Sequence, residues 1–200
     1  MIADYSPRYE DLQPHLNSRQ KIRIERRRPA NPHLNGYLVG LSPRLGMMHC
    51  FNDFQPDGYT IFYLDDIEDI RSNEYERHWD HMLVAEGVLQ GLDTVPNVNL
   101  RSMATALTSS TQAVDMLVVE CEDFDRDIQD FYIGKLVSVE GKVVEFDNFD
   151  ALGSWDEKTH RIELNEITLV QLETDYLKRF SRYVTGVPAS QRDTASQSNQ

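Results

Sequence analysis

The chain has 200 residues, of which 40% are hydrophobic and 26% are charged, and its formal net charge is −13. The apolar content is sufficient for packed cores, but no stretch approaches the roughly 20 apolar residues that a transmembrane helix needs. The charge argues against a nucleic-acid surface on the second half, where residues 84–200 hold 20 acidic and 10 basic residues and would repel a phosphate backbone.

The start of the chain and its cysteines bear on localisation. The sequence begins MIADYSPRYEDLQP, with acidic residues and prolines where a secretory signal peptide needs basic residues and then an apolar run. Cys50 and Cys121 each lie in an apolar, strand-like stretch, which is typical of reduced cysteines in a core. We therefore expect a cytoplasmic protein with no membrane segment.

The first part of the chain predicts a short arm and then five strands. Residues 1–17 read as an irregular arm with one helical turn near Tyr9, and a strand begins at Gln20. Residues 28–36 predict a loop, since two prolines prevent ladder hydrogen bonds and Asn35-Gly36 is a strong turn pair. Further strands are expected at about 37–42, 45–53, 59–64 and 66–71. Strands this short, with turns this close, favour a small and strongly bent barrel.

A helix with an aromatic stripe is expected to follow these strands. Asn73 is the predicted N-cap, and Tyr75, Trp79, Met82 and Leu83 recur at helical spacing, so they should form one face against the barrel. In a second helix at 174–184 the matching residues are Tyr176, Phe180, Tyr183 and Val184. These stripes favour core packing rather than a ligand site.

The second part of the chain repeats the plan of the first. After a linker at 92–98 and a helix at 100–107, strands are expected at 116–121, 132–139, 142–146, 160–164 and 166–172. The residues from 185 onward have no apolar spacing, and we expect a disordered tail at 185–200.

The similarity of the two parts extends to single residues. The segment GYTIFYLDDIEDI at 58–70 aligns with the residues 100 positions later, so that Leu64 matches Leu164 and Ile67 matches Ile167. We interpret this as a tandem repeat of about 70 residues, a size at which each unit can be a small domain. The predicted domains are 18–88 and 98–184.

The repeated pattern resembles the Sm-like (Lsm-related) fold. Each copy has five bent strands, a Gly-x-Leu sequence on the second strand (Gly36 and Leu38; Gly134 and Leu136) and spaced aliphatic residues around the last corner. The resemblance implies a mainly β chain with short helices that forms two tandem five-stranded antiparallel barrels. It also implies assembly, because members of the family pair barrel edges into rings.

Both copies depart from the RNA-binding members of that family. The Asp and Asn of the first family motif are absent, and the Ile-Arg-Gly of the second is replaced by Phe62-Tyr63-Leu64 and by Ile162-Glu163-Leu164. In RNA-binding members the Asn hydrogen-bonds the base and the Arg helps to build the pocket. We therefore expect the family's RNA pocket to be lost, with Glu163 placing a negative charge where a cation would be.

One basic cluster and two groups of metal-ligand residues are the candidate sites. The basic cluster consists of Lys21, Arg23, Arg26, Arg27 and Arg28, and it fits either a charged edge strand or a nucleic-acid-binding surface. Asp123, Asp125 and Asp127 in the acidic 122–130 loop resemble the start of a calcium loop, but Ile128 and Gly134 stand where an EF-hand needs Gly and Glu. Glu74, His78 and His81 share a helix face, which a surface helix explains equally well.

These observations favour a binding role over catalysis. We find no phosphate loop, serine elbow or acid–base pair, so we expect no catalytic residues, no cofactor and no metal. The leading hypothesis is a non-enzymatic tandem Sm-like scaffold or protein-interaction protein. The alternative is an RNA-binding Sm-like protein that uses a non-standard surface. The expected partners are further copies of the chain, as a dimer or trimer, or another protein at the barrel edges, with RNA disfavoured and no membrane.

Overall fold

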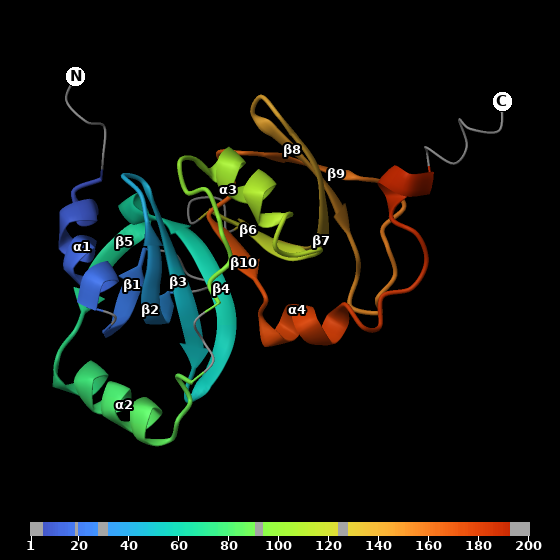
Figure 1. The fold of residues 1–200 in the computed structure, drawn as a ribbon. Coiled ribbons are helices and arrows are strands. Elements are labelled where there is room, and N and C mark those ends of the chain that lie inside the picture. Colours follow the sequence, from blue (N-terminus) through green and yellow to red (C-terminus); the bar gives the residue numbers. More distant parts are fainter. Residues whose placement is uncertain (1–5, 19, 28–31, 91–93, 124–127, 193–200) are drawn as a thin grey trace.

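The computed structural model describes residues 6–18, 20–27, 32–90, 94–123 and 128–192 (Figure 1). This part of the chain is mainly β with short helices, and its strands form one ten-stranded antiparallel sheet that is not closed into a barrel. The strands are β1 (Lys21–Arg26), β2 (His33–Leu41), β3 (Leu45–Asn52), β4 (Gln55–Tyr63), β5 (Ile67–Arg71), β6 (Leu117–Asp123), β7 (Ile128–Glu140), β8 (Val143–Asn148), β9 (His160–Glu163) and β10 (Leu169–Leu172). The helices are α1 (Arg8–Ser18), α2 (Glu74–Ala85), α3 (Met103–Ser110) and α4 (Asp175–Phe180), and a 3-10 turn, η1 (Leu64–Asp66), separates β4 from β5.

The same strand order occurs twice in the sheet. Across the sheet the order is β5-β1-β2-β3-β4 and then β10-β6-β7-β8-β9, so each half begins with its last strand and continues with its first four. One helix precedes the strands of each half, α1 or α3, and one follows them, α2 or α4. The two halves therefore repeat both the order and the pairing of their elements.

The expectation of two separately closed barrels is wrong, because β4 of the first half pairs with β10 of the second. Phe62 lies opposite Leu169, Ile61 opposite Val170, and Tyr59 opposite Leu172. The pairing gives partners to the backbone groups along one edge of each half and buries large apolar side chains on both strands. One continuous sheet is the result, with β5 and β9 at its two edges.

The hydrophobic core also extends across the junction between the two halves. A first cluster lies mainly in the first half, where Ile22, Ile24 and Met48 pack with Leu12 of α1, and Leu169 of β10 joins it from the second half. A second cluster draws on both halves, since Met47 and Ile61 pack with residues of β6, β8 and α3 such as Val119, Phe146 and Leu107. The two halves thus share a hydrophobic core in addition to a strand pair.

A buried ion pair also joins the halves. Arg26 on β1 and Glu122 on β6 are separated by 2.7 Å, and both side chains are fully buried. Thr168 donates a hydrogen bond of 2.6 Å from its hydroxyl to the same carboxylate. A carboxylate bonded in this way fixes the relative positions of β1, β6 and the segment before β10.

Two predictions near the start of the chain are wrong. Residues 8–18 form a full helix, although Pro14 lies inside it, because Leu12 is completely buried and anchors the helix on the first core cluster. The Asn35-Gly36 pair lies within β2 and not in a turn, with Gly36 opposite both Ile22 and Cys50. A strand neighbour on each side leaves no room for a turn at this position.

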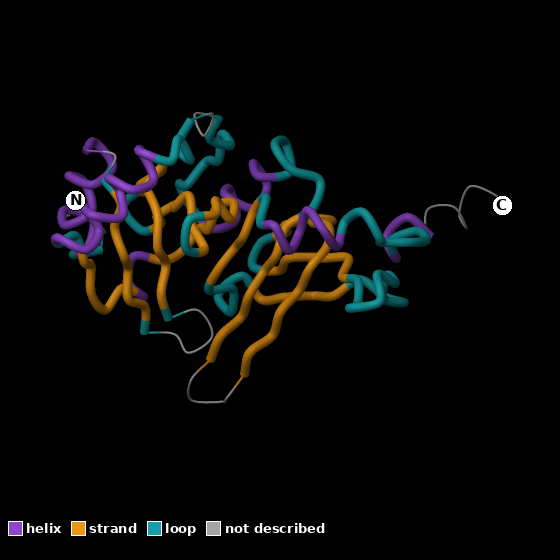
Figure 2. The backbone as a smooth tube through the Cα atoms, turned by 90° about the horizontal axis from the view of Figure 1, so that it is seen from below, coloured by secondary structure: helices purple, strands orange, loops and turns teal. Residues whose placement is uncertain are grey.

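Two further segments differ from expectation at the far end of the molecule. The hairpin of β6 and β7 projects from the body of the sheet (Figure 2), because β7 begins at Ile128 rather than near 132. Residues 185–192 are packed and not disordered: Pro188 and Ala189 are buried, and Ser190 donates hydrogen bonds to the buried Asp147. The expected tail at 193–200 lies outside the described residues. Among the helices that the structure describes, none has the length and apolar character to cross a membrane.

Candidate binding site

A cavity of about 370 Å³ lies between α2 and the first half of the sheet. Its volume falls within the range of small-molecule sites, roughly 300–1,000 Å³. The strand residues that line it face away from the first core cluster, because Ile22 and Ile24 alternate with Lys21 and Arg23 along β1. The lining residues are Lys21, Arg23, Asn35, Phe51, Asp53, Arg71, Tyr75, Glu76 and Trp79.

Helix α2 is held over this cavity by its N-terminal cap. The side chain of Asn73 accepts a hydrogen bond from the Tyr75 amide, and the carboxylate of Glu76 accepts one from the Asn73 amide at 3.1 Å. This capping box satisfies donors that the first helical turn would otherwise leave open. It also places Glu76, which is only 2% exposed, against the end of β5.

Glu76 is bound at the same time by Arg71, the last residue of β5. The guanidinium nitrogens Nη2 and Nε of Arg71 lie 2.7 and 2.8 Å from one carboxylate oxygen of Glu76. Burial raises the pKa of Glu76, but the hydrogen bonds from Arg71 and the Asn73 amide outweigh it, so the pKa is lowered. The guanidinium is therefore fixed at the rim of the cavity and keeps further N–H groups for other acceptors.

Lys21 contributes an ammonium group that is almost removed from solvent. The residue is 4% exposed, and its Nζ lies 4.9 Å from the centroid of the Trp79 ring, a cation–π contact. Burial lowers the pKa of Lys21, although the charges of Glu76 and Asp80 act in the opposite direction. Asp80 is itself occupied, since its carboxylate accepts hydrogen bonds from the Lys21 amide and the Tyr37 hydroxyl.

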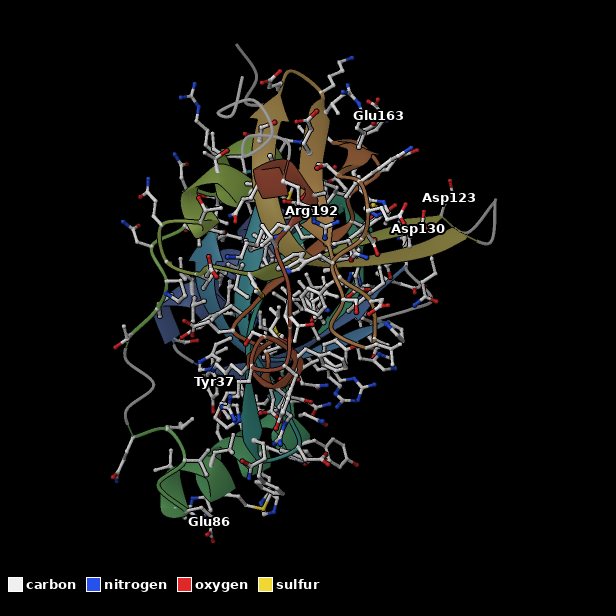
Figure 3. The ribbon with its side chains drawn as sticks, turned by 90° about the vertical axis from the view of Figure 1, so that its right-hand side faces the viewer. Tyr37, Glu86, Asp123, Asp130, Glu163 and Arg192 are labelled. Atoms are coloured by element: carbon white, nitrogen blue, oxygen red, sulfur yellow. The ribbon has the colours of Figure 1, made fainter. Side chains whose placement is uncertain are left out.

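Tyr37 and Asp80 link the sheet to α2. Tyr37 lies on β2 and extends toward the helix (Figure 3), where its hydroxyl donates to Asp80. Burial, followed by this hydrogen bond, raises the pKa of the Tyr37 hydroxyl, so it remains protonated and a donor at neutral pH. This contact fixes the distance between α2 and β2, and with it the opening of the cavity.

The aromatic stripe of α2 does not pack against the sheet as expected. Tyr75 is 63% exposed, and Trp79 stacks on Phe54 of the β3–β4 turn at 4.7 Å. Leu83 is buried and Trp79 and Met82 are half-buried, but the inward face also holds Glu76 and Asp80, which bond to Arg71 and Tyr37. Polar bonds thus hold a helix that the apolar pattern assigned to the core. In the second half, α4 is shorter than the expected 174–184, and Tyr176 and Tyr183 are exposed.

The four described residues of the predicted basic cluster do not lie together. Lys21 and Arg23 line the cavity, and Arg23 also pairs with Glu25 at 2.8 Å. Arg26 is buried in the ion pair with Glu122, and Arg27 is exposed. Arg28 lies outside the described residues. The charged strand is therefore divided between the lining of a cavity and a structural contact.

Arg71 and the exposed Tyr75 were missed as site residues. Arg71 is opposite Arg23 in the β1–β5 pair, so its place at the cavity depends on a contact between residues 48 positions apart in the chain. The local sequence contains one signal, the Asn73–Glu76 capping box, which shows that a helix begins directly after this arginine.

The structure does not bring the predicted metal-ligand residues that it describes together into a metal site. Asp125 and Asp127 lie outside the described residues, while Asp123 and Asp130 stand on the projecting hairpin (Figure 3). His78 and His81 are exposed on α2. Within the described ranges, no group of three or more His, Cys, Asp or Glu side chains is placed to hold a metal ion.

The cysteines are not prepared for nucleophilic chemistry. Burial raises the pKa of Cys50 and that of Cys121 to about 12, so both are thiols at neutral pH. A thiol is a poor nucleophile in comparison with its thiolate. Cys50 also borders a second cavity of about 270 Å³, which Asn35 and Phe51 share with the first.

Comparison of the chain with models of protein families, with curated proteins and with solved structures found no match.

Proposed function

We propose that the protein is a non-enzymatic binding scaffold built from two tandem Sm-like units. The observation that carries the proposal is the strand order. In each half the last strand comes first in the sheet and is followed by the first four strands in sequence order. The halves join where β4, the fourth strand of the first half, pairs with β10, the last strand of the second. This is the edge contact expected between neighbouring units of a Sm-like ring, here formed within one chain.

Two glycines with positive φ angles, one in each half, support the equivalence of the units. Gly36 and Gly134 have φ angles of +154° and +153°, and each lies directly against a carbonyl of the next strand, that of His49 or Asp147. Each also stands just before a register shift, between Leu38 and Gly40 or between Leu136 and Ser138. Two unrelated sheets would not be expected to bend at the same place by the same device.

The proposal can be tested by an experimental structure of the full chain. If both halves are Sm-like units, the strands β1–β5 should superpose on β6–β10 with Gly36 on Gly134 and Ile67 on Ile167. A best superposition that pairs other strands, or that leaves these residues apart, contradicts the tandem arrangement.

Binding of RNA through a non-standard surface is the second candidate function. Lys21 and Arg23 lie with Arg71, Tyr75 and Trp79 around one cavity, which provides cations and aromatic rings together. Two observations argue against RNA binding. The net charge of the chain is −13, and the positions of the family's RNA motif hold Phe62-Tyr63-Leu64 and Ile162-Glu163-Leu164.

Salt dependence separates the two functions. A protein that neutralises phosphates releases counterions, so its affinity for single-stranded RNA falls steeply as salt increases. For the scaffold we expect no submicromolar binding of oligo-uridine in fluorescence anisotropy at physiological salt. A submicromolar affinity that weakens steeply between about 50 and 200 mM salt would favour RNA binding instead.

A further inference from the structure

We propose that the cavity beneath α2 binds a small organic anion that carries a planar ring. This inference rests on the proposed function, since it assigns a ligand class to a binding protein and involves no chemical step. The cavity combines cations from two strands with aromatic side chains from a helix and a third strand, and each part selects one feature of the ligand.

The positive charge of the cavity selects an anion. The lining itself has one positive charge in excess, because it holds Lys21, Arg23 and Arg71 but only two carboxylates, Asp53 and Glu76. Two further acids lie outside the lining, Glu25 paired with Arg23 and Asp80 bonded to Tyr37. The Lys21 ammonium is largely desolvated, while Glu76 accepts from Arg71 and Asp80 accepts from the Tyr37 hydroxyl and the backbone amide of Lys21. A cation in this situation gains from a carboxylate or phosphate that enters the cavity.

The arginines make the site directional. Glu76 holds two nitrogens of Arg71 on one side, and Glu25 holds Nε of Arg23. Because a guanidinium is planar, holding some of its nitrogens also fixes the direction of its remaining N–H groups. These groups are then oriented to donate to the paired oxygens of a carboxylate or a phosphate. Arg23 and Arg71 are direct neighbours across the β1–β5 pair, so both can reach the same anionic group.

The aromatic residues select a planar ring. Tyr75 stands on the first turn of α2 at the mouth of the cavity and is 63% exposed, although it belongs to an otherwise apolar stripe. Its ring is free to cover a flat ligand, while Trp79 is stacked on Phe54 and forms a rigid wall. Stacking of a ligand ring on an exposed tyrosine removes apolar surface from water on both partners.

The surroundings favour a small anion over a nucleic acid. A phosphate backbone that left the cavity would continue across a strongly acidic molecule, where repulsion grows with each phosphate. The volume of about 370 Å³ suits one ring system with one anionic group. Nucleoside monophosphates and aromatic carboxylates share this chemistry, and binding experiments can distinguish them.

The test is isothermal titration of the full chain with four probes. Adenosine 5′-monophosphate and indole-3-carboxylate carry both a ring and an anion, adenosine carries the ring alone, and inorganic phosphate carries the anion alone. We expect at least one of the first two probes to bind about tenfold or more tightly than adenosine and phosphate, because a charge-assisted hydrogen bond and a stacked ring are both lost in the single-feature probes. The stronger of the two ring-bearing anions identifies the source of the ligand.

Variants locate the binding. Tyr75→Ala and Lys21→Met should each weaken the best probe by about tenfold. The matched control is Tyr183→Ala, which removes a tyrosine of the second half that is also exposed, at 74% compared with 63% for Tyr75. It should leave the affinity unchanged. Tyr75 is exposed, so its variant should fold, and thermal melting of all three variants shows whether a loss of binding reflects a loss of structure.

Three results would overturn the inference. The first is that no probe binds at concentrations up to about 1 mM, which is a free energy of only about −4 kcal/mol. The second is equal binding of adenosine and its monophosphate together with no effect of Tyr75→Ala. The third is binding of oligo-uridine without binding of any small probe, which would assign the surface to RNA. None of these results affects the superposition of the two halves, so the tandem scaffold can survive the loss of its ligand.

Discussion

At the scale of single residues, Gly36 and Gly134 show how the same bend is made twice. A Cβ atom on Gly36 would lie 1.9 Å from the His49 carbonyl oxygen, and one on Gly134 would lie 2.0 Å from that of Asp147. Both partners are backbone atoms of a paired strand, so neither can move aside without breaking the pairing. Glycine at these positions is required by the close approach of two strands.

We predict that Gly36→Ala and Gly134→Ala each destabilise the fold by about 2 kcal/mol or more, since both combine a steric clash with a φ that alanine rarely adopts. Urea unfolding followed by tryptophan fluorescence measures the change. The matched control is Gly141→Ala, because Gly141 has a φ of +60° but no atom within 4 Å of the added Cβ. It should cost about 1 kcal/mol. Equal effects at all three positions would contradict the close-approach explanation.

Ile67 and Ile167 test the alignment of the repeats at a second position. Both are 1% exposed, Ile67 at the start of β5 and Ile167 just before β10. Truncation of either to Ala should cost about 2–5 kcal/mol through lost burial and a residual cavity. Val84→Ala on the exposed side of α2 is the control and should change little. Melting curves of both Ile variants that match the wild type would show that the two residues are not core equivalents.

The candidate site was only half predictable at this scale. Lys21 and Arg23 stand out in the sequence because the alternation KIRIERRR places them on one face of a strand. Arg71 does not stand out, since it reaches the cavity only when β5 pairs with β1. Tyr75 was assigned to the core because its spacing from the other apolar residues of α2 allows it to face inward. The rotation of the helix about its axis is set instead by the N-terminal cap and by the Arg71–Glu76 pair, which turn Glu76 toward the sheet.

At the scale of elements, we expect the attachment of α2 to depend on pH. Glu76 caps the helix, binds Arg71 and has a lowered pKa in the folded protein. A group with a lowered folded-state pKa stabilises fully above its unfolded pKa, and that stability is lost as the pH falls through the folded-state value. The contribution of Glu76 should therefore be complete at pH 7 and decline below about pH 4.5.

We predict that Glu76→Gln lowers stability at pH 7 and flattens the acid side of the stability profile. Urea midpoints measured from pH 3 to pH 7 for wild type and variant provide the comparison. Glu74→Gln is the control, because Glu74 lies in the same first turn but is exposed. A wild-type profile and a Glu76→Gln profile that remain parallel across this range would show that the carboxylate of Glu76 contributes nothing through its ionisation.

The prediction of elements succeeded where the pattern was local. Most strand positions, the capped start of α2 and the tandem order follow from alternation, turn residues and the repeat. The helix α1 was underestimated because Pro14 lowers helix propensity, while its stability comes from Leu12 against the first core cluster. The strand at Asn35-Gly36 was interpreted as a turn because glycine occurs both in turns and at close contacts between strands. Only the pairing with β1 and β3 distinguishes the two cases.

At the scale of the whole molecule, the junction of the halves was outside the reach of the sequence. The pairing of β4 with β10 joins residues about 110 positions apart, and nothing in either strand alone specifies that partner. The same holds for Arg26, which the sequence places in a basic surface and the fold places against Glu122. Long-range pairing of this kind depends on both halves being folded.

We predict that the Arg26–Glu122 pair is strongly coupled. Glu122→Leu alone leaves Arg26 buried beside an apolar group and should cost about 3–5 kcal/mol. The double variant Arg26→Met with Glu122→Leu should lose much less than the sum of the two single variants, because it removes both charges together. A double-mutant cycle by urea unfolding measures this coupling energy. Additive effects of the two substitutions would show that the contact does not hold the junction.

The free edges of the sheet bear on assembly, which remains a prediction. If copies join as the halves do, β9 of one copy should pair with β5 of the next in the register of β4 with β10. Shifted by the repeat of 100 residues, that register places Glu163 opposite Glu68 and His160 opposite Arg71. Glu163 stands at the outer edge of the sheet (Figure 3), and the Glu68 carbonyl already accepts a hydrogen bond from Arg8. The inner junction has apolar pairs, whereas the outer one would oppose like charges, which weakens strand pairing.

We therefore predict a weak homo-oligomer whose mass rises with protein concentration, and a stronger one for Glu68→Lys. This substitution replaces a repulsive cross-strand pair by an attractive one and should tighten association by about fivefold. Light scattering over a range of concentrations measures both. Glu86→Lys is the control, because it makes the same change of charge at an exposed position at the end of α2 and not on an edge strand. A monomer mass at high concentration for wild type and Glu68→Lys alike would end the edge-joining model, since the strands would then fail to pair even after the opposing charge is reversed.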